Sequence, residues 1–225
     1  MRLGVIADVH SNIHALRSAV EVMDAERVEA IFFAGDAVGY GANPNECCDT
    51  LRRICHRSIR GNHDEAVVTK IFSGMNPYAH AAANWTIGVL NESARMFLES
   101  LRPSANEVID NRTIAMYHGS PRTMNEYVYA ESAQEDILDI AKADMVILGH
   151  THMPYVKEFT RGIILNPGSV GQPRDSDPHG SLAVVETDPL RCRIIRFGYL
   201  IDDAAKAIRD QGLPHVLAER LRTGR

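Results

Sequence analysis

The chain has 225 residues, of which 45% are hydrophobic and 24% are charged, and its formal net charge at pH 7 is −5. This composition is typical of one globular α/β domain that can bury a substantial core. The acidic balance argues against a dedicated nucleic-acid binder, and no apolar run is long enough for a membrane span.

The first half of the chain alternates strand and helix signals. An apolar run at residues 5–7 predicts a first strand that stops at Asp8. Asn12 is a suitable cap for a helix whose apolar positions follow a period close to 3.6 residues. Further along come a strand at 30–34, a helix at 47–54 and a weaker strand at 57–60. This order predicts a largely parallel sheet.

Residues 65–105 interrupt that order, because they contain no clear strand and their apolar positions have helical spacing. We expect a small insertion of two or three helices here. Beyond it, the Asp110-Asn111-Arg112 turn predicts a hairpin. A helix at about 132–143 and an apolar strand at 145–148 follow.

The last third contains four short apolar runs separated by turn residues, at 155–159, 163–165, 182–186 and 192–197. They predict antiparallel strands of a second sheet, followed by a closing helix at 202–211. We therefore expect an α/β fold with two sheets, built as one domain over residues 1–225.

The cysteines indicate a reducing environment. The chain has four of them, two adjacent and none with C-x-x-C spacing, so neither a disulfide framework nor a zinc ribbon is suggested. We expect a cytoplasmic protein with partly buried thiols.

Several predicted strands are each followed directly by a residue of a type that binds metals. Ligands of open α/β sheets gather outside the carboxyl ends of the strands, so these side chains are predicted to share one crevice. Seven candidates are too many for a single tetrahedral ion and suit two ions that share a carboxylate. The candidates are Asp8, His10, Asp36, Asn62, His118, His150 and His152.

The ligand chemistry points to hard or borderline metals. Carboxylate, amide oxygen and imidazole ligands without a thiolate suit Mn²⁺, Fe or Zn²⁺. Two divalent ions would outweigh Asp8 and Asp36 and leave about two positive charges, which attract phosphate even in an acidic protein.

Five short motifs resemble those of the calcineurin-like metallophosphoesterases, in the same order and with similar spacing. The loop at residues 166–171 resembles that of the bacterial branch of small phosphodiesterases. The motifs are Asp8-Val9-His10, Gly35-Asp36, Gly61-Asn62-His63-Asp64, His118-Gly119 and Gly149-His150-Thr151-His152.

The resemblance implies a four-layer αββα sandwich of two mixed sheets and two divalent metal ions, with Mn²⁺ expected and Fe, Zn²⁺ or Ni²⁺ as alternatives. It assigns Asp8, His10 and His152 to the first ion and Asn62, His118 and His150 to the second. Asp36 would bridge both ions, and a hydroxide between them would attack phosphorus. His63 would act as a catalytic, non-ligand histidine, with Asp64 orienting its ring. We also expect Asp64 to favour the protonated ring, which would donate a proton to the departing alkoxide.

One departure from the family pattern bears on the substrate. Tyr40 stands where the phosphatase branch has a phosphate-binding arginine, which favours small phosphodiesters, nucleotides among them. Arg122 and Arg174 are weaker candidates for phosphate contacts, and Tyr40 itself for a stacking contact. The alternatives are a phosphomonoesterase or protein phosphatase, and a non-catalytic metal-binding scaffold. We expect a small phosphorylated substrate and no membrane or dedicated nucleic-acid partner; the sequence also allows a homo-oligomer.

Overall fold

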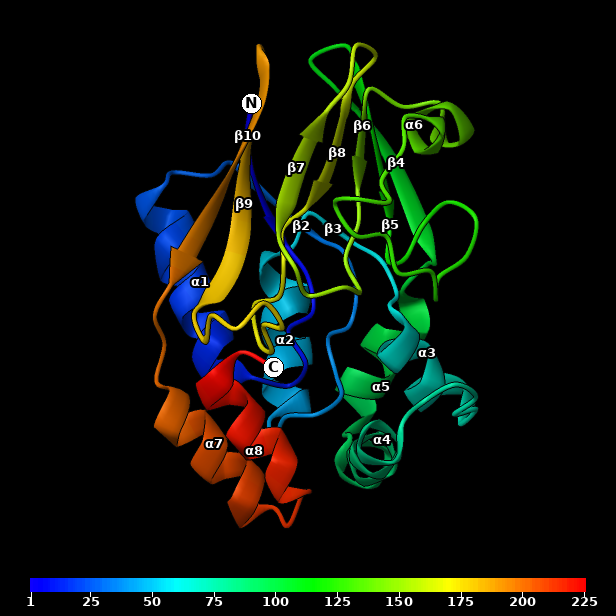
Figure 1. Ribbon diagram of the computed structural model, residues 1–225. Helices are drawn as coiled ribbons and strands as arrows, with labels where there is room; N and C mark the ends of the chain where they lie inside the picture. The colour runs from blue at the N-terminus through cyan, green and yellow to red at the C-terminus, as the bar shows by residue number, and fades with distance from the viewer.

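The computed structural model describes residues 1–225, which form two five-stranded sheets packed face to face (Figure 1). The first sheet has the order β10-β9-β1-β2-β3 and the second the order β4-β5-β6-β8-β7. The strands of the first sheet are β1 (Arg2–Ile6), β2 (Ala30–Phe33), β3 (Arg57–Ser58), β9 (Gly180–Thr187) and β10 (Leu190–Phe197). Those of the second are β4 (Ser104–Ile109), β5 (Arg112–Tyr117), β6 (Met145–Ile147), β7 (Tyr155–Glu158) and β8 (Ile163–Asn166).

Both sheets are mixed. Strands β1, β2 and β3 run parallel, while β9 pairs antiparallel with β1. In the second sheet, β5, β6 and β8 run parallel and the edge strands β4 and β7 are antiparallel to their neighbours.

The layers follow from alternation along the strands. Leu3 and Val5 of β1 point into the core between the sheets, whereas Ile6 packs under the helices on the outer face. Helices α1 (Ile13–Ala25), α2 (Pro44–Ile54) and α5 (Glu92–Ser100) cover that face, and α6 (Asp136–Ala141) covers the second sheet. The predicted αββα sandwich is confirmed.

Helix α1 begins as predicted, because the Asn12 side chain accepts a hydrogen bond from the Ala15 amide at 3.1 Å. Its buried stripe includes Leu16 and Met23. The chain between β3 and β4 forms three helices, namely α3 (Asn62–Thr69), α4 (Pro77–Val89) and α5. Figure 1 shows them below the sheets, beside the C-terminal helices α7 (Ile201–Asp210) and α8 (His215–Thr223).

Three features of the second half of the chain differ from the predictions. The runs at 182–186 and 192–197 lie in β9 and β10 of the first sheet, not in the second. Strand β9 is buried on both faces along nearly its whole length, so it occupies an interior position next to β1. The helix predicted from residue 132 begins only at Asp136, and α8 was not predicted.

Helix α8 lacks a side-chain N-cap and is stabilised by packing Leu217 and Leu221 against α7. None of the helices combines the length and apolar character that a membrane span requires.

Candidate metal centre

The seven predicted ligands come from loops at the carboxyl ends of the parallel strands. Asp8 follows β1, Asp36 follows β2, His118 follows β5 and His150 follows β6. The loops hold one another through backbone hydrogen bonds, including the Asp8 amide to the Gly35 carbonyl at 2.9 Å. All seven side chains meet in one buried or half-buried cluster between the two sheets.

One set of donors gathers around Asp8. His152 Nε2 lies 3.4 Å from Asp8 Oδ1, and His10 Nε2 lies 3.1 Å from His152 Nε2. The group of Asp8, His10 and His152 places one ligand atom of each residue close enough together to hold one ion.

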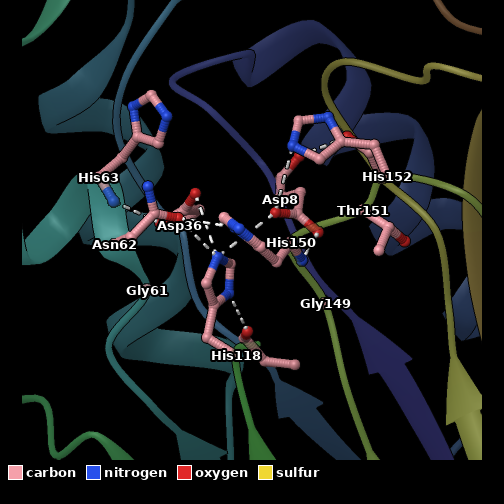
Figure 2. A network of polar contacts seen from close by, with 12 residues as sticks. Asp8, Asp36, Gly61, Asn62, His63, His118, Gly149, His150, Thr151 and His152 are labelled. Atoms are coloured by element: carbon pink, nitrogen blue, oxygen red, sulfur yellow. Dashed lines mark hydrogen bonds and ion pairs between the residues drawn. The ribbon is translucent and has the colours of Figure 1, made fainter. Parts of the chain in front are cut away.

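A second set gathers around Asn62, whose Oδ1 lies 3.0 Å from His118 Nε2 and 2.9 Å from His150 Nδ1. Asp36 lies between the two sets. Its Oδ2 is 3.3 Å from His118 Nε2 (Figure 2) and 3.6 Å from His10 Nε2. Its other oxygen accepts a hydrogen bond from the His63 amide at 2.8 Å.

Backbone carbonyls fix the orientation of three imidazoles. Nδ1 of His10, His118 and His152 lies 3.0, 2.8 and 2.5 Å from the carbonyl oxygens of Val38, Ala34 and Gln172. A neutral ring that donates from Nδ1 presents the lone pair of Nε2 inward, which is the arrangement a metal requires.

This arrangement fits cations. The Nε2 lone pairs of His10 and His152 face each other at 3.1 Å, and Asp8 Oδ1 is buried without a hydrogen-bond partner. Buried acceptors without a donor are costly, and a cation placed among them relieves that cost. The residues present therefore suit divalent ions.

Three of the imidazoles are in the neutral form that binds a metal. Burial holds the pKa of His10 and His152 well below the usual range, and burial with the nearby His118 lowers the pKa of His150 to about 3. Burial also raises the pKa of Asp8 to about 8. Burial alone would lower the pKa of His118, but Asp36 and Asp8 raise it to about 10. Cation binding would displace that proton, since imidazole binds metals in its neutral form.

Five of the seven predicted ligands have left-handed backbone. Their φ angles are 53° at Asp8, 48° at His10, 62° at Asp36, 67° at His150 and 60° at His152. Such conformations are uncommon outside glycine and concentrate at functional sites.

His63 lies beside the ligands, with its ring centroid 4.8 Å from that of His10. Its Nδ1 is buried without a hydrogen-bond partner, and burial lowers its pKa to about 4. Gly39 makes room for this ring, because a Cβ at Gly39, whose φ is +100°, would collide with His63 Nδ1. The ring is therefore neutral near pH 7, in contrast to the protonated form expected from the sequence.

Asp64 does not orient that ring, which corrects the expectation from the family resemblance. Its carboxylate accepts three backbone amides, those of Asp36 at 2.9 Å, Val38 at 3.1 Å and Gly61 at 3.0 Å. It therefore holds together the two loops that carry Asp36 and Asn62.

The weaker candidates separate into two groups. Tyr40 lies at the site, with its ring 4.7 Å from that of His10, and Arg174 donates to the Tyr40 hydroxyl at 3.1 Å. Arg122, by contrast, is engaged on the surface by Glu126 and Asp136, so its prediction as a phosphate contact is not supported.

Sequence reasoning missed several residues that shape the site. Asn166 donates to the Gly149 carbonyl at 2.7 Å, and the Ser169 hydroxyl donates to the Asp8 carbonyl at 2.7 Å. Both lie in the loop that resembled the small phosphodiesterases, which was the available signal. The Tyr127 ring lies 4.1 Å from that of His150, and no motif marked it.

Known proteins resemble the chain in both sequence and structure. The calcineurin-like phosphoesterase superfamily domain matches residues 1–189. An uncharacterized protein from Methanocaldococcus jannaschii is 33% identical, over 99% of this chain and 98% of its own. Phosphodiesterase YfcE from Escherichia coli is 22% identical, over 84% of this chain and 90% of its own.

Among solved structures, a metallophosphoesterase from Sphaerobacter thermophilus superposes with a TM-score of 0.86 at 34% identity, covering 100% of this chain and 99% of that one. With the family match over residues 1–189, this likeness establishes that the chain belongs to the calcineurin-like phosphoesterase superfamily.

Proposed function

We propose that the chain is a two-metal phosphoesterase that hydrolyses small phosphodiesters. The observation that carries the proposal is Asp36, whose carboxylate lies between two complete sets of donors. A shared carboxylate is what a pair of ions requires, whereas a single ion would leave half of these buried donors unused.

Asp8, His10 and His152 would hold one ion, Asn62, His118 and His150 the other, and Asp36 both. Divalent ions there supply Lewis acidity, which lowers the pKa of water and neutralises charge on phosphoryl oxygens. Mn²⁺ is the metal we expect, because the set mixes oxygen and imidazole ligands.

His63 would stabilise charge rather than donate a proton as an imidazolium. Its ring is neutral although a carboxylate oxygen of Asp36 lies within 4.8 Å of it, and it lines a cavity that also reaches Asn62 and His150. A neutral imidazole can donate one hydrogen bond to a phosphoryl oxygen, where charge accumulates during displacement.

Arg174 would contact the substrate phosphate directly. It donates to Tyr40 and to Gln172 Oε1, both from one nitrogen, and no carboxylate pairs with its guanidinium. The remaining N–H groups are free to bind an oxygen of a phosphate. Tyr40 would position it, since the guanidinium also lies over the Tyr40 ring at 5.5 Å from the centroid.

The presence of Arg174 at the site also favours a second candidate function, that of a phosphomonoesterase. Tyr40 stands where the phosphatase branch has a phosphate-binding arginine, but Arg174 supplies a positive charge beside Tyr40. Such a charge stabilises a phosphate monoester dianion more than a diester monoanion. The name of the YfcE relative supports the diester.

Hydrolysis of bis(p-nitrophenyl) phosphate and p-nitrophenyl phosphate, which share a leaving group, separates the two candidates. We expect a higher kcat/KM for the diester with Mn²⁺, and a clear preference for the monoester would overturn the proposal. Measuring the metal content of purified variants tests whether Asp36 binds both ions. Asp36→Asn should lose metal at both sites, whereas His10→Ala should mainly weaken one.

A further inference from the structure

A cleft of about 210 Å³ opens beside the second donor set. It is lined by Asn62, His63 and His150 on one side and by Asn76, Asn125 and Tyr127 elsewhere. A second cavity of about 190 Å³ adjoins it and shares Asn62 and Asn125. A group attached to a phosphate at the metal centre would extend into this space.

No lysine, arginine, aspartate or glutamate lines the 210 Å³ cleft. A second phosphate or a charged peptide side chain would lose hydration there without gaining an ion pair. The cleft therefore favours substrates whose phosphate at the metals is joined to an uncharged group.

The cleft wall carries a flat aromatic surface. Tyr127 is 50% exposed and Tyr129 39% exposed, and their rings stack with centroids 6.1 Å apart at an angle of 13°. Exposed rings of this kind do little for folding, but Tyr127 is both a cleft residue and in contact with the His150 ring. The Tyr127 ring therefore lies next to the candidate metal centre, with half of the residue's surface exposed.

The segment carrying these rings is held in place. Val128, between them, is buried, and its carbonyl accepts a hydrogen bond from the Tyr155 hydroxyl at 2.9 Å. Arg122 and Glu126 form an ion pair at 2.8 Å just before Tyr127. A fixed ring loses little freedom when a planar ligand stacks on it.

Polar recognition is available at the same place. The side-chain amide of Asn125 is exposed and has no hydrogen-bond partner within the protein, so it offers both a donor and an acceptor. A nucleobase is the uncharged group that combines a flat π-face with such a polar edge.

We propose that this cleft is a nucleoside subsite, in which the base of a nucleoside phosphodiester stacks on Tyr127 and its edge meets Asn125. The inference rests on the proposed diester hydrolysis and names the substrate class.

The test compares two monoanionic diesters with the same leaving group, thymidine 5′-(p-nitrophenyl phosphate) and methyl p-nitrophenyl phosphate. Metal-loaded wild type should prefer the nucleoside ester. Tyr127→Leu should lower kcat/KM for that ester, through KM, about tenfold more than it lowers kcat/KM for the methyl ester, because stacking on one ring contributes about that factor. Tyr127→Phe should retain the preference.

Tyr78→Leu is the matched control, since Tyr78 is an exposed tyrosine at the start of α4 that does not line the cleft. Metal content is measured for each variant because Tyr127 touches His150. Equal kcat/KM for the two esters in wild type, or an equal loss on both in Tyr127→Leu, would overturn the subsite.

Calorimetry tests the nucleoside subsite by binding alone, without hydrolysis. Thymidine 5′-monophosphate should bind the metal-loaded chain more tightly than methyl phosphate, and Tyr127→Leu should remove that difference. Inactivity toward both diesters would refute the proposed function alone. Equal binding of the two monophosphates by wild type would refute the nucleoside subsite.

Discussion

Replacing Asp64 should lower the folding stability of the metal-free chain. Its buried carboxylate accepts the amides of Asp36, Val38 and Gly61 at 2.9 to 3.1 Å. Asp64→Ala removes all three acceptor contacts and leaves three buried N–H groups unpaired. Asp64→Asn keeps the shape, but its NH₂ group would face amide donors in place of one carboxylate oxygen.

The size of the effect follows from these contacts. Each buried donor left unsatisfied costs about 1–3 kcal/mol, and the three lie on two loops that relax together, so we expect a loss of about 3–6 kcal/mol for Asp64→Ala. The asparagine variant can retain the two bonds from Asp36 and Gly61, which share one oxygen, but its NH₂ group then faces the Val38 amide, so it should lose about 2–4 kcal/mol. For a chain of this length, the alanine variant should melt on the order of 10 °C below wild type.

Thermal and urea unfolding in the presence of a chelator is the measurement, because it removes metal binding from the comparison. His63→Ala is the control: the His63 ring makes no hydrogen bond, so its removal should cost less stability. The reasoning is refuted if Asp64→Ala unfolds like wild type yet loses activity selectively on alkyl esters, since that result would return Asp64 to orienting His63.

Three further outcomes are expected. Gly61→Ala would place a Cβ against Asp36 Oδ1 and should weaken metal binding about 10–100-fold in a metal titration, while Gly88→Ala, where the added Cβ meets no atom, should not. His63→Ala should lower kcat about 10²–10³-fold, equally on alkyl and p-nitrophenyl esters, with both metals retained; a loss confined to alkyl esters would restore a general-acid role. Arg174→Ala should raise KM about tenfold without changing metal content, and unchanged kinetics would remove Arg174 from phosphate binding.

The candidate ligands could be named from the sequence because each ends a short apolar run or begins the next helix. Strand ends converge in an α/β sandwich, so the pattern predicted proximity without knowledge of any loop. The structure places His118 Nε2 3.9 Å from Asp8 Oδ1, although the two residues follow strands of different sheets.

The sheet that β9 and β10 join could not be read from the pattern. The run at 182–186 looks the same whether it pairs with β1 or with β8, and only the edge left open beside β1 decides the matter. Long-range pairing depends on which buried edge lacks a partner, and that is a property of the assembled fold.

The directions in which side chains point could not be predicted from the sequence either. Asp64 follows His63 directly, and adjacency suggested that the carboxylate orients the ring. On the first turn of α3, however, adjacent side chains point in different directions, and Asp64 turns back toward the helix N-terminus, where the Gly61 amide needs an acceptor. Arg122 and Arg174 looked equivalent in sequence until neighbouring carboxylates engaged the first and left the second unpaired.

The left-handed backbone at the ligands explains why so much of the surrounding loop is hydrogen-bonded. Left-handed residues other than glycine cost about 1–3 kcal/mol each in general, toward the low end for aspartate and histidine, so five of them are a substantial local cost. At Asp8 the backbone is held on both sides: its amide donates to Gly35, and its carbonyl accepts from the Gly171 amide and the Ser169 hydroxyl. These bonds stabilise the geometry of Asp8 in the absence of an ion, so we expect the residues at 166–171 to contribute to metal affinity without touching a metal.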